Sequence, residues 1–240
     1  MTDTHISMIR RARWALAIAA SALALVAGGA IWQLAFRAPA VDLLPLPEGL
    51  VSFAAAEGHR MLAESPASTD YPSLSRTFEP QSRPAFCGVA SSVAVLNALH
   101  PSRPRLTQAG FFADWPTELR VTLTGMTLQQ LGELLRQHGA DAEIVLAAET
   151  SLDAFRVVAR ENLSRSGDYV LVNYQRALLG QRGGGALAAY SAATDRFLIL
   201  DVAAYRYPPT WVSAADLWNA MNTVDSTSGR TRGFAVIRGT

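Results

Sequence analysis

The 240-residue chain lacks lysine altogether and has a single cysteine, Cys87. One cysteine excludes an intramolecular disulfide, and it also excludes zinc sites built from paired cysteines. No run of basic residues occurs beyond the N-terminus, so the charge pattern gives no sign of nucleic-acid binding. Charged residues make up only 17% of the chain and hydrophobic residues 50%, which argues against intrinsic disorder. The length and composition therefore indicate a globular domain of ordinary size with a sizeable core.

The first 40 residues carry a membrane-targeting pattern. A basic cluster at positions 10–13 precedes an uncharged stretch from Trp14 to Trp32, and the apolar character continues to Phe36. At about 1.5 Å per residue in a helix, this stretch is long enough to cross a bilayer core. An uncleaved anchor fits its length, whereas a cleaved signal peptide fits the small residues at 38–40. A buried globular helix is the third and least favoured interpretation.

Arginines before the apolar stretch predict an N-terminus in the cytoplasm. The body of the protein is then periplasmic, either anchored at the inner membrane through residues 14–36 or released after cleavage. We expect a targeting segment over 1–40, an extended linker over 41–50 and a domain over 51–240. Removing 1–40 takes away four of the 21 arginines and one of the 20 acidic residues, so the remaining chain has a net charge of −2.

In the expected domain, helices come first and strands second. Apolar residues recur at helical spacing in the first half, and Thr127 and Gln130 form a capping-box pattern. The predicted helices are 57–64, 87–99, 128–138, 152–163 and 213–221. The predicted strands are 142–147, 169–174, 187–191, 197–202 and 233–238, and 66–75 is expected to be rich in turns. Helices segregated from an antiparallel set of strands indicate an α+β fold.

Cys87 is the candidate nucleophile. It begins the predicted helix 87–99, where the helix dipole favours the thiolate and is expected to lower the pKa of the thiol. Small residues at 88, 90 and 91 leave the sulfur accessible. The competing interpretation is a buried structural cysteine, which is the common situation of a lone cysteine.

A cysteine nucleophile needs a general base and a group that orients that base. The chain has four histidines: His5, His59, His100 and His138. None of them lies in the strand-rich second half, where the base of such a site usually occurs. Asp201 ends the apolar strand 197–202 and is the candidate orienting carboxylate.

The motifs around these residues resemble the phytochelatin synthase family. The segment 81–91, Gln-Ser-Arg-Pro-Ala-Phe-Cys-Gly-Val-Ala-Ser, resembles the family's nucleophile motif. Matches at 172–176, 199–203 and 207–212 follow in the family's order, and others at 217–225 and 232–234 extend the resemblance over residues 50–238. The chain resembles the short bacterial type, which lacks the cysteine-rich C-terminal region of the plant enzymes.

This resemblance implies a papain-like fold and activity on glutathione. In the family, the cysteine attacks the Cys–Gly peptide bond, releases glycine and holds a γ-glutamylcysteinyl thioester. Water as acceptor gives γ-Glu-Cys, and a second glutathione gives phytochelatin. The resemblance implies no tightly bound cofactor. A heavy-metal ion such as Cd or Zn would arrive as a thiolate of the substrate, in keeping with a role in heavy-metal detoxification. A homodimer is left open.

Three catalytic roles are implied by the resemblance. Cys87 matches the nucleophile, Gln81 the oxyanion-hole glutamine and Asp201 the aspartate that orients the histidine. Counting back from Asp201 places the family's histidine at Gly183, where the chain is shorter than the family pattern and has no histidine. Loss of a triad base lowers turnover by about 10⁴- to 10⁶-fold.

Three further residues match family positions around the substrate. Arg176 and Arg206 match basic positions of the substrate pocket, where a guanidinium can pair with a carboxylate, and Asp225 matches a supporting acid. Ala204 stands where the family usually has an arginine. Two hypotheses remain: an impaired transferase or hydrolase acting on glutathione, and a catalytically silent member that binds a thiol peptide or a metal thiolate. We expect no metal site in the protein itself.

Overall fold

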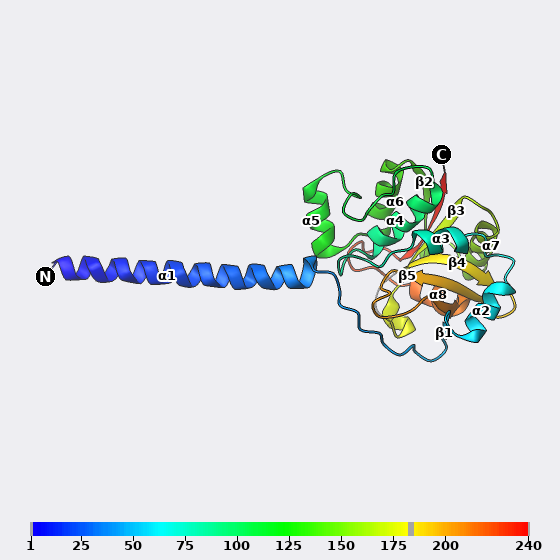
Figure 1. Ribbon diagram of the computed structural model, residues 1–240, viewed down its shortest axis with the longest axis horizontal. Helices are drawn as coiled ribbons and strands as arrows, with labels where there is room; N and C mark the ends of the chain where they lie inside the picture. The colour runs from blue at the N-terminus through cyan, green and yellow to red at the C-terminus, as the bar shows by residue number, and fades with distance from the viewer. Residues whose placement is uncertain (1, 182–184, 240) are drawn as a thin grey trace. The chain divides into compact units, whose positions relative to one another are not determined.

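The computed structural model describes residues 2–181 and 185–239 (Figure 1). The chain divides into two compact units, Met1–Arg37 and Ala38–Thr240. The first unit consists of the helix α1 (Thr2–Ile31), which continues into the π-helical turn η1 (Trp32–Phe36). Its apolar stretch Leu16–Phe36 has 21 residues and no buried side chain, so its length and composition fit a membrane span. A signal sequence near an N-terminus has the same properties.

The second unit consists of one antiparallel sheet with helices packed around it. Within the described residues the sheet has seven strands in the order β1-β6-β5-β4-β3-β7-β2, and every neighbouring pair is antiparallel. The strands are β1 (Val51–Ser52), β2 (Ala140–Leu146), β3 (Asp168–Asn173), β4 (Gly185–Ser191), β5 (Arg196–Asp201), β6 (Thr210–Ser213) and β7 (Gly233–Gly239). The predicted α+β class and the antiparallel strands are therefore confirmed.

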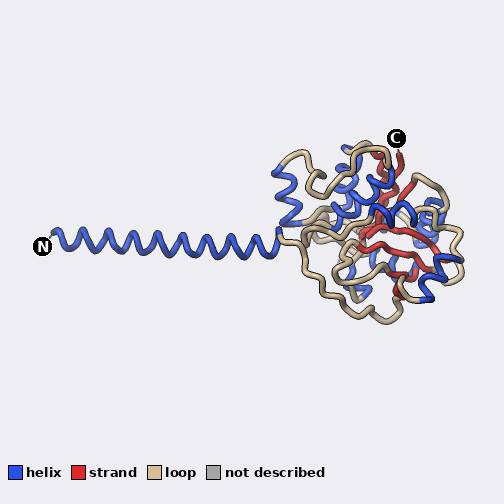
Figure 2. The backbone as a smooth tube through the Cα atoms, in the orientation of Figure 1, coloured by secondary structure: helices blue, strands red, loops and turns tan. Residues whose placement is uncertain are grey.

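Helices cover both faces of this sheet (Figure 2). They are α2 (Ala56–Ala63), α3 (Tyr71–Thr77), α4 (Cys87–Leu99), α5 (Trp115–Thr124), α6 (Leu128–Gln137), α7 (Leu152–Leu163) and α8 (Ala214–Met221), with short turns η2 (Ala147–Glu149) and η3 (Arg176–Leu179). Strand alternation sorts the side chains between the faces. In β7, Ala235 and Ile237 join the core under α4 and α6, whereas Phe234 and Val236 join the core under α7 and α8.

Helix caps explain why several predicted boundaries are confirmed. Helices α4 and α7 have the expected bounds, and Ser151 caps α7 by accepting a hydrogen bond from the amide of Ala154. Both bonds of the predicted capping box between Thr127 and Gln130 are present, and α6 ends one residue earlier than expected. These local signals satisfy backbone groups that a helix end otherwise leaves without partners.

Two helices and two strands were not expected. Helix α5 begins after Asp114, whose carboxylate accepts from the amide of Thr117, and it has Pro116 in its first turn. Helix α3, in a segment expected to be turns, likewise has a proline, Pro72, in its first turn. Proline at the start of a helix is favourable, because the amide it lacks would have no partner there. The short strands β1 and β6 pair with each other at one edge of the sheet.

The segment 41–50, expected to be an extended linker, lies along the second unit. The amides of Asp42 and Leu44 donate to the carbonyls of Tyr205 (2.8 Å) and Arg206 (2.9 Å). The Arg196 guanidinium donates to the carbonyl of Gly49 at 2.7 Å. This part of the chain is thus extended and held by hydrogen bonds.

Candidate active site

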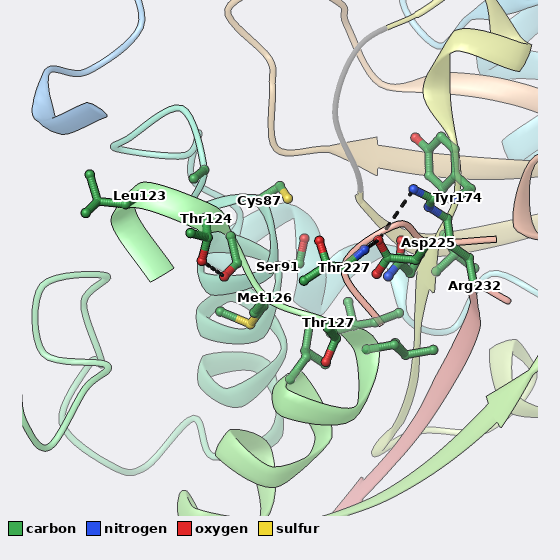
Figure 3. Close-up of a pocket in the computed structure, with 18 residues that line it drawn as sticks. Cys87, Ser91, Leu123, Thr124, Met126, Thr127, Tyr174, Asp225, Thr227 and Arg232 are labelled. Carbon is green, nitrogen blue, oxygen red and sulfur yellow. Dashed lines mark hydrogen bonds and ion pairs between the residues drawn. The ribbon is translucent and has the colours of Figure 1, made fainter. Parts of the chain in front are cut away.

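A cavity of about 440 Å³ lies beside the start of α4 (Figure 3). Its walls come from the first turn of α4, the end of α5, the turn into α6, the end of β3 and the segment 225–232. A cavity of this size falls within the range that accommodates small-molecule ligands. Both apolar and polar groups line it, and α4 contributes Cys87, Gly88 and Ser91 to the wall.

Cys87 is the first residue of α4 and is half-buried at the cavity wall. Burial raises the pKa of its thiol above the ordinary value, and the negative charge of Asp201 acts in the same direction. The charge of Arg176 and the backbone amides at the helix start lower that pKa, but they do not cancel the effect of burial. The helix start therefore acts in the expected direction, but the expectation of a lowered pKa for the Cys87 thiol is wrong. Desolvation of the thiolate is larger than the helix contribution.

Asp201 and Arg176 form a buried ion pair. Asp201 ends β5 and Arg176 begins η3, and each side chain is only 2% exposed. The Asp201 Oδ1 accepts from the Arg176 guanidinium and also from the amide of Ala203, at 2.8 Å. Among the described residues, its Oδ2 has no hydrogen-bond partner. The carboxylate that was expected to orient a histidine is bonded to an arginine instead.

Gln81 lies in the turn before α4 and is buried. Its amide donates to the carbonyl of Val202 at 2.9 Å, which ties the turn to the chain just after β5. Its side-chain Nε2 donates to the carbonyls of Arg83 (2.9 Å) and Pro84 (2.7 Å). Both amide hydrogens are thereby used, so a role as oxyanion donor requires one of them to turn toward the substrate. That role stays a prediction.

No histidine lines the cavity among the residues that the structure describes. His59 and His138 each pack against a phenylalanine ring elsewhere in the fold. His100 follows the 13-residue helix that Cys87 begins, which places the two about 20 Å apart along the helix axis. The position at Gly183, where the family's histidine was expected by counting, lies outside the described residues. The site as described has no imidazole base.

The residues expected to bind substrate lie in different surroundings. Neither Arg176 nor Arg206 is among the described residues that line the cavity; Arg176 is paired with Asp201, and the Arg206 guanidinium lies 5.7 Å from the ring centre of Tyr205. Asp225 does line the cavity, and its Oδ1 accepts from the amide of Thr227 at 3.1 Å. Of these three residues, only Asp225 is placed where a cavity ligand could contact it.

Arg232 is a site residue that the sequence did not single out. It is the only arginine among the described residues lining the cavity, and it lies 3.8 Å from the carboxylate of Asp225 (Figure 3). Its guanidinium is held by the Thr223 hydroxyl at 3.0 Å and the Val224 carbonyl at 2.8 Å. The family match at 232–234 was the available signal, but it did not assign a role to this side chain. Arg232 and Asp225 together present one positive and one negative group to a ligand in the cavity.

Comparison with known proteins decides the family. Residues 41–234 match the model of the phytochelatin synthase family. The chain belongs to this family. Two relatives, each named glutathione gamma-glutamylcysteinyltransferase 1, from Lotus japonicus and Triticum aestivum, are each 35% identical over 208 residues, which is 81% of this chain and 41% of the relative. The glutathione gamma-glutamylcysteinyltransferase of Schizosaccharomyces pombe is 27% identical over 178 residues, covering 70% of this chain and 43% of that protein.

Membership of the phytochelatin synthase family confirms the resemblance noted from the sequence motifs. The chain spans about two fifths of the length of the curated relatives that it matches. The match includes the turn before α4, the cavity and the buried ion pair, because all of them fall within residues 41–234.

Proposed function

We propose that this member of the phytochelatin synthase family acts on glutathione by acyl transfer through Cys87. The observation that carries the proposal is the position of the single cysteine, at the first turn of a buried helix and in the wall of a cavity large enough for a tripeptide. The names of the relatives support glutathione as the acyl donor. A papain-like arrangement of helix, strand and cysteine is implied by the family and belongs to the same proposal.

The proposed reaction begins when the Cys87 thiol releases its proton to solvent. The thiolate attacks the carbonyl carbon of the cysteinyl residue of glutathione, and the bond to the glycine nitrogen breaks. The departing amine takes a proton from water, and a γ-glutamylcysteinyl thioester remains on the enzyme. Water then releases γ-Glu-Cys and restores the thiol, or the amine of a second glutathione takes the acyl group to form phytochelatin.

Arg232 and Asp225 are the residues we propose for holding the substrate. Glutathione carries two carboxylates and one ammonium group, and a guanidinium binds a carboxylate through a planar pair of hydrogen bonds. The carboxylate of Asp225, 3.8 Å from Arg232, suits the ammonium group. A metal ion such as Cd or Zn would enter as part of the substrate thiolate. We keep Arg176, Arg206 and Gln81 as predicted site residues to be tested by substitution.

A second function is favoured by one observation, the absence of an imidazole from the described cavity wall. Without a base, the thiol must ionise unaided, and nothing positioned in the cavity protonates the leaving amine. A silent member would bind glutathione or its metal thiolate in the same cavity and leave the peptide bond intact. The two functions share a ligand and differ only in turnover.

Glycine release from glutathione separates these two functions. The assay uses the full chain with and without cadmium, beside Cys87→Ala, and Cys87→Ser serves as the nearly isosteric control. The enzyme proposal predicts glycine release by the wild type that both variants lose. Equal background release in all three proteins would overturn it, and glutathione binding measured by calorimetry would then support the silent function.

We also propose that the second unit works in the periplasm, either anchored through residues 14–36 or released by cleavage. The 21-residue apolar stretch and the arginines before it support this placement. Fractionation of cells that express the full chain, followed by N-terminal sequencing, distinguishes the two forms. Recovery of the protein in the cytoplasmic fraction would contradict both.

A further inference from the structure

The buried Arg176–Asp201 pair takes no part in the bond-making and bond-breaking steps of the proposed reaction. We propose that Arg176 is a positioning residue that holds the Asp201 carboxylate in the place of an imidazole and supplies a fixed positive charge beside the Cys87 thiolate. This inference rests on the proposed function, because it assigns the charges around the same nucleophile. It gives Arg176 a role different from direct binding of substrate.

The geometry fixes Arg176 firmly. It begins the turn η3, which Gly180 follows with φ +66°, and the amide of Gln181 donates to the Arg176 carbonyl at 2.9 Å. The preceding amide, that of Gln175, donates to the carbonyl of Ala220 in α8 at 2.8 Å. The guanidinium is bonded to Asp201, with both side chains 2% exposed. A charge held this way cannot swing into the cavity without breaking a buried ion pair.

A guanidinium cannot replace imidazole as a base. It carries five donors, has no acceptor and stays protonated throughout the working pH range. It can act on the sulfur only through its charge, which is strong because little water lies between buried groups. The carboxylate of Asp201 acts on the sulfur in the opposite direction.

The buried pair lies close to the cavity wall that holds the thiol. The Arg176 guanidinium is 5.8 Å from the ring centre of Tyr174, which lines the same cavity as Cys87. The amide of Gln81, in the turn before Cys87, donates to the carbonyl of Val202, which follows Asp201.

Several charged and titratable groups therefore surround the thiol. They are Arg176 on η3, Asp201 at the end of β5 and Tyr174 after β3, and Asp225 and Arg232 lie in the same cavity wall. Burial raises the pKa of the Tyr174 hydroxyl, which therefore stays neutral near pH 7. Near neutral pH, Arg176 favours the thiolate and Asp201 opposes it.

The opposite effects of Arg176 and Asp201 on the thiolate predict an unusual change in the pKa of the thiol when either residue is substituted. In a cysteine–histidine–aspartate site, removal of the aspartate weakens the nucleophile, because the histidine is no longer oriented. Here the removal of the Asp201 charge should make the thiol more acidic, whereas the removal of the Arg176 charge should make it less acidic. The two variants should move the reactivity of Cys87 in opposite directions.

The rate of alkylation of Cys87 by iodoacetamide, measured from pH 6 to 10, tests this inference. Cys87 is the only cysteine, so every alkylated molecule reports on this sulfur. We expect Arg176→Gln to slow alkylation at pH 8 by about tenfold, since one unit of pKa is tenfold in thiolate. Asp201→Asn should speed it several-fold, and Arg176→Lys, which keeps the charge, should lie near the wild type. Arg156→Gln, which breaks a matched arginine–aspartate pair elsewhere, should leave the profile unchanged.

Circular dichroism establishes that each variant is folded before its profile is compared. If Arg176→Gln does not fold, the double variant Arg176→Gln/Asp201→Asn removes both charges and should have a thiol profile near the wild type. Slower alkylation in both single variants, or no change in either, would overturn the inference. Because no glutathione is present, this outcome is independent of the glycine-release assay, so a failure of the proposed function and a failure of this inference can be told apart.

Discussion

The two ends of β5 carry the same pair of residue types in opposite surroundings. At its start, Asp195 accepts two hydrogen bonds from the Arg156 guanidinium, and the two side chains are 42% and 29% exposed. At its end, Asp201 is bonded to Arg176, and both side chains are 2% exposed. At Asp195, burial raises the pKa, but the hydrogen bonds from Arg156 and Tyr190 and the charge of Arg156 together outweigh it and lower the pKa. At Asp201, burial outweighs the effect of Arg176 and raises the pKa. Solvent exposure, and not the identity of the partner, decides the direction.

The difference in solvent exposure separates an ion pair with only a structural role from one whose charges can influence a nearby functional group. A solvated pair is screened by water and contributes little to stability or to a distant charge. A buried pair cannot be broken cheaply, and its charges act strongly on whatever lies beside them. The charges of the second pair act on the pKa of the Cys87 thiol, Arg176 lowering it and Asp201 raising it, which is why we propose a role in the site for this pair and not for the first.

The largest expected difference between the two pairs is in stability. Asp201→Asn leaves a buried guanidinium without its counter-charge and should lower the free energy of unfolding by about 3–5 kcal/mol. The matched change Asp195→Asn, which suits the left-handed backbone of that residue (φ +49°), should lower it by less than about 1 kcal/mol. Urea unfolding of both variants beside the wild type measures the two values. Equal losses would show that burial does not distinguish the pairs.

The carboxyl of Asp70, which has no arginine partner among the residues that the structure describes, extends the comparison to the dependence of stability on pH. Asp70 is 1% exposed, and burial, followed by the charge of Asp168, raises its pKa to about 8. The unfolded carboxyl releases its proton near pH 4, so between pH 4 and 8 the folded state binds more protons and its stability falls as the pH rises. Asp70→Asn should remove this dependence, which we expect to be on the order of 3 kcal/mol. Urea unfolding at pH 5 and pH 8 checks it; an unchanged slope in the variant would exclude Asp70 as the cause.

A smaller effect, on glutathione binding, should distinguish the cavity arginine Arg232 from arginines elsewhere in the fold. Arg232→Gln should weaken glutathione binding by about tenfold, as expected for the loss of one charge-assisted hydrogen-bonded contact. Arg206→Gln is the control, because the Arg206 guanidinium lies over Tyr205 and not in the described cavity wall. Calorimetric titration with glutathione in the Cys87→Ala background measures both without turnover. A larger loss for Arg206→Gln would restore the original prediction that Arg206 contacts the substrate.

The sequence predicted those parts of the fold that depend on local signals. Helical spacing identified α4 and α7, and the capping box of Thr127 and Gln130, which are only three residues apart, identified the start of α6. An N-cap residue, Asp114, also precedes α5, but it was not part of the prediction. The family motif led to Cys87 because its neighbours in the chain are also its neighbours in the site.

The rest of the site depends on contacts that no local pattern encodes. Arg176 and Asp201 are 25 residues apart in the chain, so their pairing follows from the packing of η3 against the end of β5. The pKa of the Cys87 thiol was predicted in the wrong direction because the helix start is visible in the sequence and burial is not. Arg232 reaches the cavity only because the segment 225–232 folds back beside the end of β3.

The most direct test of acyl transfer is the mass of the intact chain after incubation with glutathione under reducing conditions. We predict a fraction of chains that carry one γ-glutamylcysteinyl group on Cys87, which hydroxylamine removes and a phosphine reducing agent does not, because the bond is a thioester. Cys87→Ala should carry none. A chain that binds glutathione but shows no adduct, or only a disulfide with glutathione that the reducing agent removes, would contradict Cys87 as the acyl-transfer nucleophile.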